Sequence, residues 1–142
     1  MVALLDVNVL IALLEPKHIH HDIAHDWFGN HRLGHWASCP LTQNGFIRIV
    51  SQRSYGYPMG TAAAAAALAA FIAETDHEFW PDSVSLLDPS HCDASRLSSA
   101  GQLTDTYLLA LAKAKGGQLI TLDARLSVSA VAGGRDSLTV LR

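Results

Sequence analysis

Apolar residues in this chain fall into short runs separated by longer segments with helical character. Mainly apolar runs predict strands at residues 2–5, 118–122 and 138–141, with further candidates at 35–39 and 83–87. Helical periodicity or strong helix formers predict helices at residues 7–15, 19–28, 43–52, 62–74 and 104–115. Because strands alternate with helices, we expect a three-layer α/β fold with a central parallel sheet, forming one domain over residues 1–142.

The predicted helices carry recognisable start and stop signals. Pro16 ends the first helix. Thr42, Thr61 and Thr104 each precede a helical segment, and a threonine hydroxyl can accept a hydrogen bond from a free N–H group of the first turn. Two glycines at 116–117 end the last helix. We therefore expect these three threonines to be N-caps.

Targeting and membrane signals are weak in this sequence. The apolar residues 1–14 lack a basic leading segment and are interrupted by Asp6 and Asn8. The alanine-rich run at 62–73 is too short and too weakly apolar to span a bilayer. Two cysteines, Cys39 and Cys92, allow neither a disulfide framework nor a four-cysteine zinc site. We expect a soluble protein of the reducing cytoplasm.

Charge and composition leave the function open. Of the 142 residues, 49% are hydrophobic and 16% are charged, so the chain can build a core. The formal net charge of −3 gives no overall basic signature for nucleic acid. Contact with RNA would therefore need a local basic patch, or metal ions that bridge acidic residues to phosphates. The sequence contains no P-loop and no GxGxxG stretch, so nucleotide binding has no support.

Three aspartates occupy positions where α/β proteins place functional groups. Asp6 and Asp123 each follow an apolar strand, and Asp105 lies in the first turn of a helix. Ligands of open α/β sheets collect at the carboxyl ends of strands and at helix N-termini. Carboxylates brought together there repel one another, and a hard cation such as Mg²⁺ relieves that repulsion. The pattern favours a magnesium site.

A magnesium site of this kind is suited to phosphodiester hydrolysis. The cation can lower the pKa of a bound water molecule, orient a phosphate and stabilise the leaving oxygen. Asn8 could hydrogen-bond a carboxylate or a phosphate, and Thr104 could face the site as well as cap its helix. The alternative is that each aspartate is an ordinary turn or cap residue, with Asp105 favouring the helix dipole. Spacing alone leaves both interpretations open.

Three blocks of sequence occur in the order found in a known family. They are LLDVNVLIAL near the start, SCPLTQNGFIRIV in the middle and LTDTYLLALAKAKGGQLITLDARL near the end. Together they resemble the PIN domain of VapC-type toxins, the nuclease half of type II toxin–antitoxin pairs. The segment HIHHDIAHDWF is similar to the family's second helix, so the resemblance extends over nearly the whole chain.

This resemblance implies a specific activity. PIN domains have a parallel sheet flanked by helices, and a cluster of acidic residues that binds Mg²⁺ or Mn²⁺. VapC toxins are endoribonucleases that cleave structured RNA such as tRNA or ribosomal RNA. They typically form homodimers, and a VapB antitoxin inhibits them. By position, Asp6 corresponds to the first acidic residue, Asp105 to the third and Asp123 to the fourth, so we expect these three to be the catalytic metal ligands.

The second acidic position departs from the family pattern. Many relatives have a glutamate after PLT, whereas this chain has Gln43. An amide oxygen can still accept a hydrogen bond or bind a metal, but the negative charge is lost. Weaker metal binding, or one metal rather than two, would follow. The alternative function is therefore a catalytically weakened PIN domain that binds RNA or its antitoxin without cutting.

Two rival chemistries use the histidines. His21 and His25 have the i, i+4 spacing that can bind zinc on one helix face, although no third ligand stands at a diagnostic spacing. Histidines could also cleave RNA without metal, as general acid and base acting with the 2′-hydroxyl. That reaction would leave a cyclic phosphate, whereas a metal-activated water should leave a 5′-phosphate.

Candidate RNA contacts lie near the same blocks. Two tyrosines, Tyr55 and Tyr57, occupy a predicted loop and could stack on unpaired bases. Five basic residues could contact phosphates, and each could equally be ordinary surface: Arg48, Arg53, Lys113, Lys115 and Arg125.

Overall fold

The computed structural model describes residues 1–31, 35–56 and 58–142 and contains a five-stranded, all-parallel sheet. The strand order along the sheet is β3-β2-β1-β4-β5. The strands are β1 (Ala3–Leu5), β2 (Trp36–Ser38), β3 (His77–Phe79), β4 (Gln118–Thr121) and β5 (Leu138–Val140). The parallel α/β fold expected from the sequence is confirmed.

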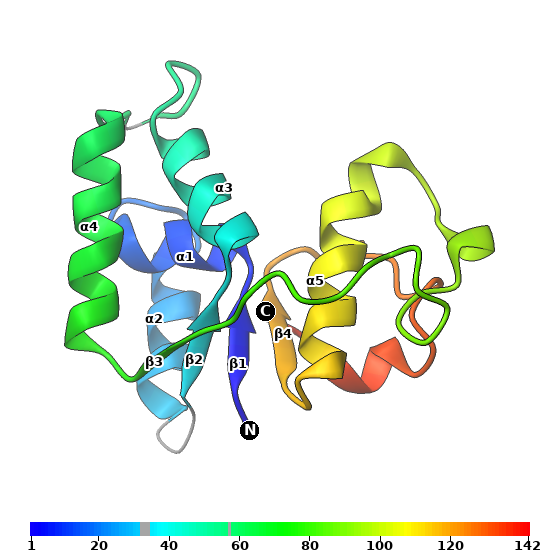
Figure 1. Cartoon of the computed structure of the whole chain (residues 1–142). Coiled ribbons are helices and arrows are strands. Elements are labelled where there is room, and N and C mark those ends of the chain that lie inside the picture. Colours follow the sequence, from blue (N-terminus) through cyan, green and yellow to red (C-terminus); the bar gives the residue numbers. More distant parts are fainter. Residues whose placement is uncertain (32–34, 57) are drawn as a thin grey trace.

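Helices cover both faces of the sheet (Figure 1). One side carries α1 (Val7–Leu14), α2 (His21–Asn30), α3 (Pro40–Val50) and α4 (Thr61–Glu74). The other side carries α5 (Leu103–Ala114) and the short 3₁₀ turns η1 (Ala94–Arg96), η2 (Ala100–Gln102) and η3 (Gly134–Ser137). Among the described residues, no helix is long and apolar enough to cross a membrane.

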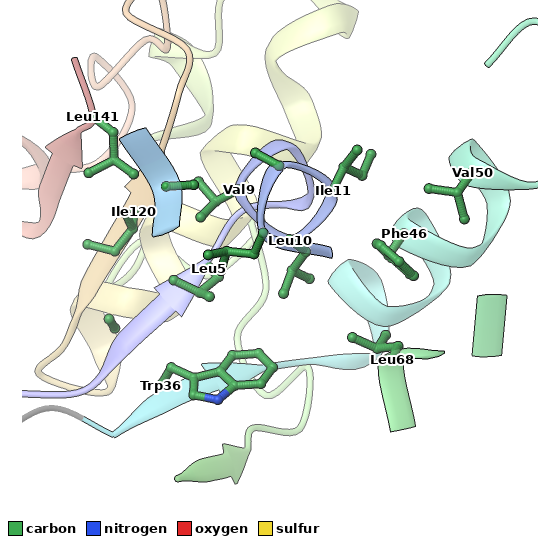
Figure 2. Packing of buried hydrophobic residues seen from close by; sticks show 14 of the residues in the cluster. Leu5, Val9, Leu10, Ile11, Trp36, Phe46, Val50, Leu68, Ile120 and Leu141 are labelled. Carbon is green, nitrogen blue, oxygen red and sulfur yellow. The ribbon is translucent and has the colours of Figure 1, made fainter. Parts of the chain in front are cut away.

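The hydrophobic core consists of two clusters, one on each face of the sheet. Alternate residues of a strand point to opposite faces, so Leu5 of β1 joins the cluster beneath α1–α4 while Leu4 joins the cluster beneath α5. Figure 2 shows the first cluster, which includes Leu5, Trp36 of β2, Ile120 of β4 and Phe46 of α3. Strands that are buried on both faces explain the continuous apolar runs of the sequence.

The strand expected at residues 83–87 is absent, and the edge of the sheet is β3 instead. β3 has the sequence His-Glu-Phe, and all three residues are half-buried or exposed, so its pattern carries no hydrophobic signal. Backbone pairing with β2 nevertheless defines it, as Ala37 pairs with Glu78. Val84 and Leu86, which gave the apolar signal, pack against the cluster beneath α5 and do not join the sheet.

The three threonines expected to be N-caps lie inside their helices. The caps are Cys39, Gly60 and Gln102, so α3 begins three residues earlier than expected, at Pro40. Proline is suited to the first helical position because its missing N–H would have no partner there. Thr42 still contributes to the helix start, since its Oγ1 accepts a hydrogen bond from the Cys39 N–H at 3.0 Å.

The chain direction brings the ends of two strands together at one point of the sheet. From β1 the chain first runs to β2 and β3 on one side, and later returns to β4 on the other side of β1. The carboxyl ends of β1 and β4 therefore flank the position where the strand order reverses, and ligands of open α/β sheets bind at such positions. Asp6 follows β1 directly, and Asp123 lies two residues beyond β4.

Candidate functional site

Asp6 is a buried carboxylate at the start of α1, with only 5% of its surface exposed. Its Oδ1 accepts a hydrogen bond from the backbone N–H of Val7 at 2.7 Å, which makes Asp6 the N-cap of the helix. Its Oδ2 accepts a hydrogen bond from the Thr121 hydroxyl at 2.8 Å. Both oxygens are thus held in place, so the carboxylate has a single orientation at the end of β1.

A small hydrogen-bond network joins the ends of β1 and β4 around this carboxylate. The side-chain amide of Asn8 donates to Thr121 Oγ1 at 3.2 Å and, more weakly, to Asp6 Oδ2 at 3.4 Å. Its Oδ1 accepts from the backbone N–H of Leu122 at 3.1 Å. Thr121 Oγ1 also accepts from the N–H of Asp123 at 3.1 Å. The expectation that Asn8 would bond a carboxylate is confirmed.

Asp105 lies with Asp6 on the wall of a cleft of about 320 Å³. Asn8, Thr104 and Arg48 also line it, so Thr104 does face the site as expected. Burial, followed by the charges of Asp6 and Asp123, raises the pKa of Asp105 to about 6. Burial also raises the pKa of Asp6, and Asp123 adds to that shift. The fold thus brings the three aspartates within electrostatic reach of one another.

Carboxylate oxygens are the hard donors that Mg²⁺ prefers, so the chemistry of this group fits such an ion. The charges of Asp6 and Asp123 raise the pKa of Asp105, and the charge of Asp123 raises the pKa of Asp6, so a cation would remove a cost of placing like charges together. Within the described ranges, however, no three His, Cys, Asp or Glu side chains are close enough to hold a metal ion as they stand. The role of Asp6, Asp105 and Asp123 as metal ligands therefore stays a prediction.

Asp123 is half-buried, and its carboxylate is bonded within its own loop. Its Oδ1 accepts a hydrogen bond from the N–H of Arg125 at 2.9 Å and lies 3.9 Å from Arg125 Nε. Its side chain is 33% exposed, whereas that of Arg125 is 93% exposed. Asp123 is not among the residues that line the cleft containing Asp6 and Asp105.

Gln43 is engaged with neighbouring strands. Its amide donates to Ser38 Oγ at 3.0 Å, and Ser38 Oγ is also hydrogen-bonded to His77 Nε2 at 2.7 Å. It does not line the cleft of Asp6 and Asp105. In this arrangement the side chain links the start of α3 to the end of β2, and through Ser38 to His77 at the start of β3.

The histidines do not assemble a zinc site among the described residues. His21 and His25 do face each other, with ring centroids 5.5 Å apart. However, His21 Nδ1 lies 2.7 Å from the carbonyl oxygen of Ala12, so this ring is used to join α1 to α2.

The candidate RNA contacts are distributed unevenly. Of the five basic residues considered from the sequence, Arg48 is the one that lines the aspartate cleft. Lys113 donates to the carbonyl oxygen of Ala132 instead. Tyr55 lines a separate apolar groove, and Tyr57 lies outside the described residues.

Thr121 is the site residue that the sequence did not single out. The only signal in the sequence is its place: Thr121 is a polar residue at the end of a mainly apolar strand, two positions before Asp123. It is fully buried and takes part in the bonds to Asp6, Asn8 and Asp123 described above.

Replacing Thr121 with valine should destabilise the protein by about 1–3 kcal/mol, because it removes a buried hydroxyl while keeping the side-chain shape. Asp6 would lose its donor at 2.8 Å, and Asp123 N–H would lose its acceptor. Urea unfolding at neutral pH measures the effect. Thr121→Ser keeps the hydroxyl and is the matched control. Valine being tolerated while serine is not would show that packing, rather than the hydrogen bonds, is what Thr121 supplies.

Comparison of the sequence with known proteins identifies close relatives. The family model described as PIN domain matches residues 3–132. The chain is 47% identical over 133 residues to Ribonuclease VapC44 of Mycobacterium tuberculosis, covering 94% of each protein. It is also 47% identical over 134 residues to Ribonuclease VapC39 of the same species, covering 94% of this chain and 96% of the relative.

Solved structures show the same fold at much lower identity. A crystal structure of VapBC2 from Rickettsia felis bound to a promoter DNA fragment matches with a TM-score of 0.64 at 12% identity, covering 100% of both chains. Mycobacterium tuberculosis VapC20, described as a sarcin–ricin loop cleaving toxin, matches with a TM-score of 0.62 at 16% identity, covering 87% of this chain and 92% of the other. At these identities the likeness concerns the fold alone.

Proposed function

The chain belongs to the PIN-domain family, and within it to the VapC-type toxins, and from this premise we propose that it is the ribonuclease toxin of a type II toxin–antitoxin pair. The observation that carries the proposal is a cleft lined by Asp6 and Asp105 where the strand order of the sheet reverses, with the charge of Asp123 acting on both carboxylates. Its substrate would be structured RNA, tRNA or ribosomal RNA, in the cytoplasm. We further propose that it forms a homodimer and that a VapB-type antitoxin inhibits it.

In this proposal the three aspartates hold Mg²⁺, with Mn²⁺ as the alternative ion. The bound ion would supply a water molecule of lowered pKa and neutralise charge on the phosphate. The protein supplies position: Val7 and Thr121 fix the two oxygens of Asp6, and Asn8 ties that carboxylate to the end of β4. Reacting groups held in this way lose little entropy during the reaction.

The experiment that tests the proposal is inducible expression of the wild type and of Asp6→Asn in bacteria, with growth followed and new RNA 5′ ends mapped across the transcriptome. We expect growth arrest and a few sharp 5′-phosphate ends with the wild type, and neither with Asp6→Asn. Asp26→Asn is the matched control, because Asp26 lies exposed on α2 and should leave toxicity intact. No guess of the substrate is needed beforehand.

The other outcomes of this experiment separate the alternatives. Ends that carry cyclic phosphate and persist in Asp6→Asn would indicate metal-free cleavage by histidines. Normal growth without new ends, from soluble folded protein, would contradict the nuclease proposal and favour the non-cutting binding module. In that case Gln43→Glu is the next variant to test, since it restores the charge that this chain lacks at the second acidic position.

A further inference from the structure

Arg48 stands on α3 where two hollows of the protein surface meet. Leu41, Gly45 and Arg48 have helical i, i+4, i+7 spacing and line the cleft of Asp6 and Asp105. Arg48 also belongs to a second helical face, shared with Asn44 and Ser51, that lines a neighbouring hollow of about 450 Å³. The same side chain therefore forms part of both walls.

The position of Arg48 relative to the aspartates is set by close packing of α1 and α3. A Cβ atom added to Gly45 would lie 2.8 Å from Val7 Cγ2, so the two helices approach each other as closely as a glycine allows. Val7 follows Asp6 directly, and Arg48 lies three residues beyond Gly45 on α3. Arg48 is thus carried on a rigid element and lines the same cleft as the two carboxylates.

Arg48 is the one basic residue among those that line the aspartate cleft. The ion pairs among the described residues involve His35, His91 and Arg125, and none of them involves Arg48. A guanidinium is the side chain best suited to hold a phosphate, because its planar donors match the phosphate oxygens in pairs. RNA carries a phosphate at every nucleotide, so a chain that enters an acidic cleft also needs a cation close by.

The second hollow suits the continuation of an RNA strand. None of its lining residues is acidic, and Arg48 is the one charged residue among them; the others are Asn44, Ile47, Ser51, Gln52 and Thr61. A mainly apolar surface of this kind places no negative charge against the phosphates of a strand, and Arg48 supplies a positive one.

We infer that Arg48 binds the RNA phosphate next to the scissile one, and that the substrate strand passes from the aspartate cleft over Arg48 along α3 toward the start of α4. The inference rests on the proposed ribonuclease function and adds to it the path of the substrate. Arg48 is in this view a positioning residue, since it holds the substrate and leaves the reacting atoms to the aspartates.

The test measures RNA binding without cleavage, in the Asp105→Asn background. The probe is a fluorescent RNA oligonucleotide that spans a cleavage site mapped as above, titrated at several salt concentrations. We expect Arg48→Gln to raise Kd about 10-fold and to lower the slope of log Kd against log salt by about 1. Arg48→Lys keeps the charge, so we expect it to keep the slope while binding about 2- to 3-fold more weakly.

Arg53→Gln is the matched control, because Arg53 is exposed just beyond α3 and lines neither hollow. It removes the same charge and should leave Kd within about 2-fold. Equal affinities and slopes for Arg48→Gln and its parent, or equal losses in Arg48→Gln and Arg53→Gln, would overturn the inference. A reduced affinity of Arg48→Gln for an antitoxin, with RNA binding intact, would overturn it as well.

The two proposals fail in different ways. If RNA cleavage depends on Asp6 but RNA affinity is unchanged by Arg48→Gln, the proposed substrate path is wrong and the proposed ribonuclease function stands. If the wild type cuts no RNA at all, both are removed together.

Discussion

Replacing Asp105 with asparagine is expected to lower RNA cleavage by about 10²–10³-fold and, in the absence of metal, to make the folded protein more stable. Cleavage falls because the amide cannot supply the negative charge that the proposed cation needs. Stability rises because the wild-type carboxylate is partly buried near Asp6 and Asp123, and these surroundings raise its pKa to about 6. The same group would thus cost stability and provide function.

The size and pH range of this stability gain follow from proton linkage. The pKa of Asp105 rises from 3.8 in the unfolded chain to about 6 in the fold, so the folded state binds the proton more tightly. A full shift of this kind corresponds to about 3 kcal/mol, and solvent screening of a half-buried group reduces it to about 1–2 kcal/mol. The wild type therefore gains stability as pH falls through about 6, and Asp105→Asn is favoured most above pH 7.

Thermal unfolding in EDTA measures this effect. At pH 7.5 the variant should unfold about 3–8 °C higher than the wild type, and below about pH 4 the two should coincide. Adding Mg²⁺ should raise the midpoint of the wild type more than that of the variant. Asp26→Asn, on an exposed face of α2, is the matched control and should change neither result. A less stable Asp105→Asn at pH 7.5 would show that the carboxylate is satisfied in the metal-free fold.

Gly117→Ala is expected to destabilise the protein by about 2–4 kcal/mol, the largest effect on folding that we expect from a single methyl group. A Cβ atom at this position would lie 2.5 Å from the carbonyl oxygen of Val2 and 2.9 Å from Trp80 Cη2. The carbonyl belongs to the backbone leading into β1, and it already accepts a hydrogen bond from the Gln118 N–H at 3.0 Å. Relief would require β1 and β4 to separate, next to the strands that lead to Asp6 and Asp123.

The neighbouring Gly116 provides the control, because its backbone conformation favours glycine, whereas at Gly117 the lack of space does. It adopts φ +68° at the end of α5, and nothing lies within 4 Å of an added Cβ atom. Gly116→Ala should therefore cost only about 1–2 kcal/mol, from backbone strain. Urea unfolding of both variants measures the difference. A larger decrease in the free energy of unfolding for Gly116→Ala than for Gly117→Ala would show that β1 and β4 can move apart at little cost.

Much of the fold could be predicted because it is encoded locally. Mainly apolar runs identified β1, β4 and β5, and helical periodicity identified α1 and α5. The threonine caps were wrong by one to three residues, since a threonine near a helix start can be N1, N2 or N3 as easily as the cap. The PIN family was recognisable because its motif blocks keep their order along the chain.

β3 could not be predicted because edge strands need little hydrophobicity. Its residues His77, Glu78 and Phe79 are held by backbone pairing with β2, which leaves no pattern in the sequence. The apolar residues Val84 and Leu86, which did show a pattern, pack on the core without pairing. Burial and strand pairing are separate properties, and the sequence reports the first better than the second.

By itself the sequence determined the fold class and the family, because each depends on residues close together in the chain or on blocks in a fixed order; it also predicted the three aspartates as metal ligands, which stays a prediction. The tertiary structure decided which other residues serve them. Thr121 bonds Asp6 across 115 positions of sequence, and Arg48 rather than Arg53 lies beside the aspartates. Gly117, unlike Gly116, is required by a strand more than 100 residues away. These contacts arise where distant segments pack together, and no local pattern encodes the identity of a neighbour that only folding supplies.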